Sequence, residues 1–396
     1  MNPSRLHFHL SGGGLAQTLR RRLRGGEARP LSIRMKIALS VLLLWLPPAI
    51  LSLVAGTFVG DAVTQPFWKD VIPQVRLLLT LPLLFIAGKN IDPALELVVQ
   101  DLDESGVIAD ADRPQYRAAF RKLEEARDST LADAIMLVLA ISLSLLPQSQ
   151  HIASTIPTAV TSSLWSMSEG KVRWTAAGAW YAFVSVPVFR FVILRWAWRF
   201  VIWARFLYRV SRLPLALRPT HPDLAGGVGI VGFAQLTFVL IFVAIGSLVS
   251  STIAQSILFD GAKFIDARPE MFAFLVSSVL LICAPLLFFA NPLYECRRRG
   301  LSEYAVLGQR LSQAFSAKWI ELPAADVGTA LKSSSDASAM ADYGATFALV
   351  ENMRVIPVPP KGVMRLVAAL LIPFFPLYFT EFSVTDLLER MSHVLM

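Results

Sequence analysis

Long apolar segments constrain this chain more than any other feature of its sequence. Seven segments, most of them about 20 residues long, match the length that an α-helix needs to cross the roughly 30 Å hydrocarbon layer of a membrane. Charged residues make up only 17% of the chain, below the roughly 25% of a soluble domain. The sequence therefore predicts an all-α, polytopic transmembrane helix bundle with about seven spans and small helical cytoplasmic loops. The segments are Ile37–Gly60, Val71–Gly88, Leu131–Leu146, Trp174–Leu194, Gly226–Leu258, Met271–Ala290 and Val363–Thr380.

Three of these segments depart from the simple pattern. The third is short, and the fifth would be roughly 50 Å long as one helix, so it must tilt or project beyond the lipid. The seventh contains Pro373 and Pro376, which predict a kink. That last segment either spans the membrane or re-enters the side it came from.

The basic residues predict the orientation. Nearly all Lys and Arg lie in the N-terminal tail, the Lys89–Arg127 loop, the Arg190–Arg218 region and the Arg297–Arg365 loop. These alternate with poorly charged loops, so the positive-inside rule places the N-terminus in the cytoplasm. The formal charge of +8 thus points to anionic membrane lipids as partners and not to nucleic acid.

The same pattern divides the chain into six regions. Residues 1–36 form a basic cytoplasmic tail, expected to be mobile, with a short amphipathic helix at the lipid surface as an alternative. In the 89–130 loop we expect two helices around Asp110–Pro114. In the 294–362 segment we expect a helix through Phe315, an extended piece at Trp319–Leu322, a serine-rich loop and a helix over Tyr343–Arg354. Spans 1–2 fill 37–88, spans 3–6 fill 131–293, and span 7 with the C-terminal tail fills 363–396.

Arginines and aromatic residues alternate over Arg190–Leu213. At about 100° per residue the arginines cover roughly half of a helix surface. We therefore expect the fourth span to continue into the cytoplasmic interface, with its aromatics at headgroup level and its arginines near lipid phosphates. Either this is a membrane anchor that obeys the positive-inside rule, or its arginines form a defined anion site. The arginine spacing does not match the every-third-residue repeat of a voltage sensor.

A glycine-rich stretch follows at Arg218–Gly229. Thr220 and Asp223 have the spacing of a capping box, and Pro222 suits a first helical turn, so we expect the fifth helix to begin here. Free amides at such a start favour an anion, whereas the plainer interpretation is a capped helix that packs closely on a neighbour. The hypothetical site for an anion or lipid phosphate comprises Arg195, Arg199, Arg205, Arg209, Arg212, Arg218, His221, Asp223, Gly226 and Gly227.

Few polar residues lie within the spans. Gln235, Ser247, Ser251 and Gln255 follow one helix face, for helix packing or for lining a pore. Arg76 is near enough to the outer end of its span to snorkel outward. No Asp, Glu, Lys or His lies mid-span, which disfavours cation coupling and leaves open an anion path lined by arginine and serine.

The sequence predicts no metal site, cofactor or disulfide. Its five histidines are scattered. Its two cysteines, Cys283 and Cys296, would lie about 20 Å apart along one helix, too far to be bridged. A catalytic pair of His221 and Asp223 lacks a third candidate residue nearby.

The arginine–tryptophan run Arg195–Phe206, the following Arg209–Leu213, and His221–Gly227 together resemble a group of uncharacterised bacterial polytopic inner-membrane proteins. The resemblance extends to Glu351–Arg354 before the last span. It implies a bacterial inner-membrane setting and brings no activity, substrate or catalytic residue.

Three functions fit these observations. The first is a non-enzymatic channel or carrier, or a component of one, for an anion. The second is a membrane-embedded sensor or scaffold that binds a protein partner through its cytoplasmic loops. The remotest is an enzyme acting on a phosphate-bearing lipid through His221 and Asp223. Helix surfaces rich in small residues permit a homo-oligomer without requiring one.

Overall fold

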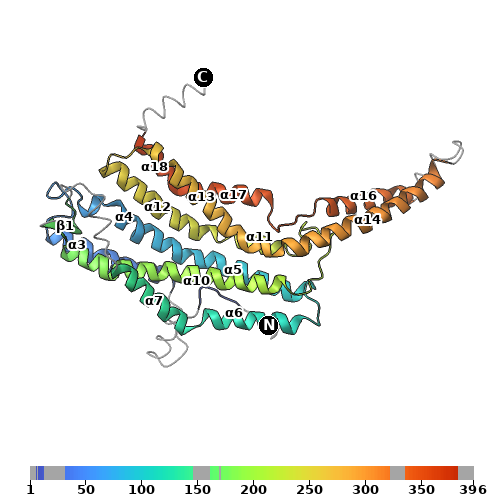
Figure 1. Cartoon of the computed structure of the whole chain (residues 1–396), viewed down its shortest axis with the longest axis horizontal. Coiled ribbons are helices and arrows are strands. Elements are labelled where there is room, and N and C mark those ends of the chain that lie inside the picture. The colour runs from blue at the N-terminus through green and yellow to red at the C-terminus, as the bar shows by residue number, and fades with distance from the viewer. Residues whose placement is uncertain are drawn as a thin grey trace, which may run out of the picture.

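The architecture is known from a computed structural model that describes residues 6, 8–12, 32–145, 161–168, 171–321 and 335–381. Helices lie side by side along the long axis of the molecule (Figure 1). A two-stranded antiparallel sheet of β1 (Trp165–Ser168) and β2 (Lys171–Trp174) lies at one end, here called the strand end. A helical hairpin projects from the opposite end, the hairpin end.

Within the described residues, six helices are long and apolar enough to cross a membrane, and a seventh apolar helix is shorter. The chain is thus a multi-pass helical membrane protein. The long helices are Ile33–Val54, Val71–Glu104, Ala176–Ser211, Gly229–Phe259, Phe264–Trp319 and Pro360–Phe379, and the shorter one is Thr130–Ser144. Each of the seven overlaps one predicted segment, and the short helix is the one predicted from the short third segment. The first helix ends at Val54 and not at the predicted Gly60.

The elements before the arginine-rich helix are as follows. The first span comprises α2 (Ile33–Ser40), η1 (Val41–Trp45) and α3 (Leu46–Val54), and η2 (Phe67–Lys69) follows it. The second comprises α4 (Val71–Gln74), η3 (Val75–Thr80) and α5 (Leu81–Glu104). Then come α6 (Arg113–Arg127) and α7 (Thr130–Leu145). As predicted, α5 and α6 are two helices joined by a turn that contains Asp110.

The arginine-rich helix forms the centre of the bundle. It comprises α9 (Ala176–Trp180), η4 (Tyr181–Ser185) and α10 (Val186–Ser211). Trp196 and Trp203 are buried, and their indole N–H groups donate to Leu84 O of α5 (3.1 Å) and to Gln235 Oε1 (3.0 Å). These two indoles therefore face neighbouring helices, and the headgroup level expected for the aromatics of this helix stays a prediction. A buried indole N–H needs an acceptor, and neighbouring helices supply one.

The fifth span begins later than predicted and is broken. It comprises α11 (Gly229–Leu236) and α12 (Val239–Phe259). The predicted start at Pro222 fails because Leu224, Gly226 and Gly227 have positive φ angles of 54°, 66° and 100°, which no α-helix contains. The predicted segment Gly226–Leu258 was too long for one membrane-crossing helix, and the break between α11 and α12 divides it into two helices.

The sixth span runs far beyond the membrane. It comprises η5 (Phe264–Ala267), α13 (Arg268–Cys283), η6 (Ala284–Phe289) and α14 (Ala290–Trp319). Its 56 residues would measure about 84 Å at the α-helical rise, so α14 projects at the hairpin end. There α16 (Asp336–Glu351) folds back on it, and the Tyr343 hydroxyl donates to Tyr304 O (2.7 Å). Trp319 ends α14 and is not extended as predicted; Leu322 and most of the serine-rich loop lie outside the described residues.

The last apolar segment crosses the bundle. It comprises α17 (Pro360–Leu371), η7 (Ile372–Phe374) and α18 (Phe375–Glu381), so the helix changes geometry at the predicted proline kink. It starts beside the hairpin and reaches the strand end (Figure 1), where the rings of Tyr378 and Phe264 lie 6.5 Å apart. It is long enough to span.

Candidate functional site

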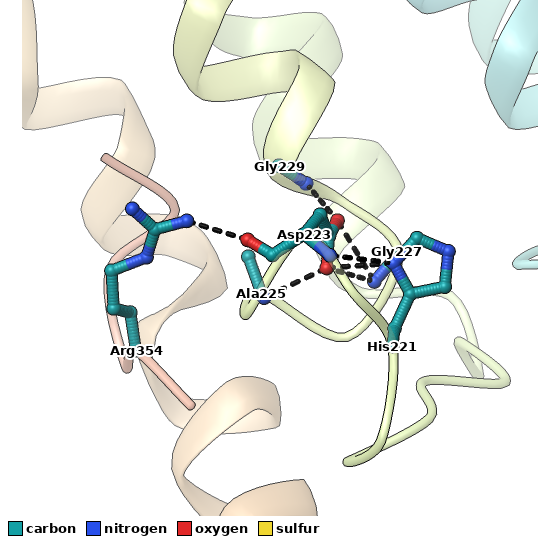
Figure 2. Close-up of polar contacts among 6 residues, drawn as sticks. All are labelled: His221, Asp223, Ala225, Gly227, Gly229 and Arg354. Atoms are coloured by element: carbon teal, nitrogen blue, oxygen red, sulfur yellow. Dashed lines mark hydrogen bonds and ion pairs between the residues drawn. The ribbon is translucent and has the colours of Figure 1, made fainter. Parts of the chain in front are cut away.

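The Asp223 carboxylate closes the predicted glycine-rich site from within. Figure 2 shows it at the start of α11. Its Oδ1 accepts hydrogen bonds from the amides of Ala225 (2.8 Å) and Gly227 (3.2 Å). Its Oδ2 accepts from the amide of Gly229 (2.8 Å). The amide donors that would attract an anion therefore already bind an anion that belongs to the chain, and Asp223 caps α11.

The local sequence explains this loop. Left-handed conformations at Leu224, Gly226 and Gly227 turn the chain around the carboxylate, and glycine tolerates them without steric cost. The predicted capping box does not form. Thr220 lies nine residues before the helix start, and its hydroxyl makes no hydrogen bond within the described part of the chain.

His221 lies beside this carboxylate, with Nδ1 2.7 Å from Asp223 Oδ1. Burial alone would raise the pKa of Asp223, but the amides of Ala225 and Gly229, then His221, lower it below the usual value. An ionised carboxylate held by several donors is a stable structural cap. It has little basicity left for acid–base catalysis.

The same loop binds the segment before the last span. The guanidinium of Arg354 donates to Asp223 O (2.5 Å; Figure 2). The backbone amide of Arg354 donates to Leu224 O (2.7 Å). The neighbouring Met353 is buried against Gly226. His221–Gly227 and Glu351–Arg354 thus meet at the base of the projecting hairpin.

The arginines of the predicted site do not converge. Arg195 forms an ion pair with Asp133 of α7 (3.3 Å), and Arg199 is buried and donates to Ser11 O (2.6 Å). By contrast, three of the others point to the exposed surface and one is half-buried. The exposed ones are Arg205, Arg212 and Arg218, and the half-buried one is Arg209. The predicted anion site therefore divides into a buried pair and a surface group, and anion binding there stays a prediction.

The side chains of the predicted polar stripe form hydrogen bonds mainly to neighbouring helices. Gln235 accepts from Trp203 and donates to Ile282 O (2.9 Å). Ser247 Oγ lies 2.9 Å from Thr80 Oγ1, and Gln255 Oε1 accepts from the amide of Val71 (3.1 Å). Ser251 donates to Leu248 O of its own helix (2.7 Å). Of the two uses proposed for this stripe, helix packing accounts for these bonds.

A second pair of arginines, Arg76 and Arg190, lies inside the bundle and is not part of the predicted site. Arg76 turns into the bundle instead of snorkelling outward. Its guanidinium donates to the Tyr181 hydroxyl (2.5 Å) and lies 5.5 Å from the centre of the Phe189 ring. Arg190, next to Phe189, donates to the Ser144 hydroxyl (2.9 Å) and lies within electrostatic range of Arg76.

The two side chains lie at different depths along their helices. Arg76 is about 8 Å along its helix from Val71, and Arg190 is about 21 Å from Ala176, both counted from the strand end. Ser144 lies about 16 Å along α7 beyond Asp133, the partner of Arg195. The sequence already indicates a buried arginine here, because Arg190 falls inside the predicted fourth span, Trp174–Leu194. Its assignment to the flanking basic region concealed this.

This pair carries positive charge without a bound carboxylate. Within the described residues, neither Arg76 nor Arg190 lies within ion-pair distance of an Asp or Glu. The Arg76 Nε is buried and has no hydrogen-bond partner. The same residues contain no group of three or more His, Cys, Asp and Glu that could hold a metal ion. The chemistry of this cluster thus suits an anion.

Removing the carboxylate of Asp223 is expected to destabilise the hairpin-end loop. In Asp223→Ala, the amides of Ala225, Gly227 and Gly229 lose their acceptor, which we expect to cost about 2–4 kcal/mol because each half-buried unsatisfied donor is costly. Thermal unfolding in detergent, followed by tryptophan fluorescence, measures this loss. The matched control is Thr220→Ala, which should change stability by less than about 0.5 kcal/mol. Equal melting of both variants would contradict the assigned role of Asp223.

No protein-family model matches this chain, and neither does any curated protein or solved structure.

Proposed function

We propose that this chain is a bacterial inner-membrane protein that binds a small anion between Arg76 and Arg190 and conducts or carries it across the membrane. The observation that carries the proposal is this pair of arginines inside the bundle without a carboxylate partner. In the proposed orientation the N-terminus and the hairpin end are cytoplasmic, following the basic residues at that end.

The energetics favour a bound counter-ion. An arginine at the centre of a membrane helix costs about 2.5–3.5 kcal/mol on insertion scales, and the cost falls toward the helix ends. Two nearby arginines also repel each other. The hydroxyls of Tyr181 and Ser144 accept hydrogen bonds but do not neutralise the charge. An anion would neutralise it and would satisfy the free Nε of Arg76. Guanidinium groups suit this task because they present several donors in a fixed plane.

Positive charge continues from this pair toward the hairpin end. Arg190, Arg195 and Arg199 follow at five- and four-residue intervals along α10. Asp133 partly neutralises the row at Arg195. Such a row attracts an anion toward the middle of the membrane while binding it less tightly near the cytoplasmic end, a combination that conduction needs.

Flux from proteoliposomes tests this function. The purified full chain is reconstituted into vesicles loaded with chloride, nitrate or phosphate, and efflux is followed with an ion-selective electrode. We expect efflux of at least one of these anions above that of protein-free vesicles. Efflux equal to that of empty vesicles for all three anions, from protein that remains folded by size-exclusion chromatography, would refute transport.

Anion flux is expected to fall as the pH rises through about 7. Burial raises the pKa of Asp70 to about 7, although the amide of Ile72 and the charge of Arg76 lower it in part. Below this pH the carboxyl is neutral. Above it, the ionised carboxylate supplies Arg76 with negative charge and competes with the transported anion. Flux at equal pH on both sides, measured from pH 6 to pH 8, checks this.

The variant Asp70→Asn keeps the side chain neutral at every pH. It should therefore retain the pH 6 flux at pH 8. An unchanged pH profile in this variant would exclude Asp70 as the titrating group.

A second candidate function rests on the hairpin of α14 and α16. Because α14 continues a membrane span without a linker, the hairpin is held rigidly to the bundle. Its base is fastened further where Arg297 donates to Glu351 O (2.9 Å) and where Gly300 packs against Pro219. A rigid projection of this kind favours a sensor or scaffold that contacts a protein partner in the cytoplasm.

Partner capture from native membranes discriminates between the two functions. The intact chain and a chain in which residues 305–346 are replaced by a short Gly–Ser linker are purified in parallel. Loss of co-purifying proteins with unchanged anion flux would support the scaffold. The same partners in both preparations would refute it. An enzyme that acts on a phosphate-bearing lipid has the least support, because the Asp223 carboxylate already accepts hydrogen bonds from backbone amides.

A further inference from the structure

Residues 8–12 lie inside the bundle, contrary to the expected mobile tail. Phe8 and Leu10 are fully buried. The Phe8 ring lies 5.7 Å from Phe120 of α6 and 6.4 Å from Trp203 of α10, between ring centres. The Arg127 guanidinium covers the same ring at 5.6 Å. An aromatic pocket thus encloses one side chain of this segment. An amphipathic helix was expected somewhere in residues 1–36, of which 1–5, 7 and 13–31 lie outside the described part.

Charged side chains at the hairpin end bind the backbone of the same segment. The Ser11 amide donates to Asp92 Oδ1 (2.8 Å), and its hydroxyl donates to Asp92 Oδ2. Arg199 donates to Ser11 O (2.6 Å), and Arg127 donates to His9 O (3.3 Å). In the described chain, Asp92 and Arg199 make no other hydrogen bond. The buried carboxylate of Asp92 and the buried guanidinium of Arg199 therefore both take their hydrogen bonds from Ser11 alone in the described chain.

This arrangement is a built peptide site. The pocket between α5, α6 and α10 supplies an aromatic enclosure, a carboxylate for an amide and a hydroxyl, and a guanidinium for a carbonyl. These groups recognise a peptide that carries a bulky apolar side chain and, three residues later, a serine within a turn. If the segment left, the pocket would expose apolar surface and two charges without hydrogen bonds, so another peptide of this kind could replace it.

The segment can leave without unfolding a span. It forms no part of any described helix or strand, and residues 13–31 separate it from α2. We propose that the segment of residues 8–12 is a detachable plug that fills a peptide-binding pocket at the hairpin end of the bundle, and that the pocket accepts the same peptide from a second chain. This proposal does not depend on anion transport.

Peptide binding tests the pocket. A fluorescent peptide with the sequence of residues 1–14 is titrated into the full-length protein, and anisotropy is measured. The variant Phe8→Ala, whose own plug is weakened, should bind the peptide at least about tenfold more tightly than the unmodified chain does, since losing a buried aromatic costs more than 1.4 kcal/mol. Adding Asp92→Asn should abolish this gain, and a peptide carrying Phe8→Ala should not bind. Equal affinity of the unmodified chain and the Phe8→Ala variant, or binding to neither, would overturn the proposal.

Thiol labelling tests whether the plug detaches when Phe8 is unchanged. This test therefore still decides the question if the Phe8→Ala variant misfolds. Leu10→Cys is introduced together with Cys283→Ser and Cys296→Ser, and maleimide is added to membranes. A detachable plug predicts complete labelling, slower than that of denatured protein. Absence of labelling in Leu10→Cys while the denatured protein reacts fully would show that the segment is fixed.

Discussion

Replacing Arg190 with glutamine is expected to reduce anion flux by about 10- to 100-fold. Hydrogen bonds to a charged group contribute about 1.5–3 kcal/mol, and each 1.4 kcal/mol corresponds to a factor of ten in binding. Glutamine can still bond the Ser144 hydroxyl, so the packing of α10 on α7 is retained. The loss should therefore come from charge and not from unfolding.

Arg76→Gln should have a similar effect, and the double variant should lose little more than either single variant. Two groups that hold one ligand act together, so their effects are not additive. Vesicle flux at matched protein content measures all three. The control is Arg298→Gln on the exposed surface of α14, which removes the same charge outside the bundle. Flux that falls equally in this control and in Arg190→Gln would indicate a general effect of net charge.

Gly232→Ala is expected to prevent stable folding. A Cβ atom at Gly232 would lie 1.6 Å from the Pro357 carbonyl oxygen, far inside van der Waals contact. Pro359 and Pro360 follow closely, so the segment before α17 is stiff, and moving it aside would cost free energy. We expect a loss above about 4 kcal/mol, in the range where a single substitution unfolds a marginally stable protein.

The matched control is Gly344→Ala in α16, where a Cβ would meet no atom within 4 Å. Alanine is favoured over glycine inside a helix by about 1 kcal/mol, so this variant should be slightly more stable. Yield and melting temperature by fluorescence-detected size-exclusion chromatography measure both variants. Normal yield of Gly232→Ala would show that α11 and the segment before α17 do not pack as described.

The membrane-spanning helices were predictable because their signal is local. A run of apolar residues of sufficient length must bury its backbone polar groups in a helix, whatever surrounds it. For the same reason Pro373 predicted the change of geometry within the last span. The break between α11 and α12 was not predicted, because no proline or glycine marks it.

The partners of charged side chains were not predictable in this way. The partner of Arg195 is Asp133, which lies on another helix, and the partner of Asp92 is Ser11, 81 residues away. Helical periodicity places a side chain on a face but does not say which neighbour covers that face. The predicted arginine site therefore combined buried and exposed residues that the fold separates.

Two signals were local and were nevertheless missed. Leu6, Phe8 and Leu10 alternate with histidines, which is the pattern of an extended segment with one buried face. In the structure Phe8 and Leu10 are buried, and the chain turns at Leu10 and Ser11. Asp223 precedes two left-handed glycines, which allow a carboxylate to fold back onto amides that follow it. Both patterns are short, and the strong basic character of the tail and the apparent capping box concealed them.

The most direct test of the arginine pair is to locate the anion itself. Crystals grown from lipid with iodide in place of chloride are measured near a wavelength at which iodine scatters anomalously. The account predicts an anomalous peak in contact with the guanidinium groups of Arg76 and Arg190, absent from crystals of Arg76→Gln. Iodide peaks confined to the exposed arginines Arg205, Arg212 and Arg218, with none between Arg76 and Arg190, would contradict it.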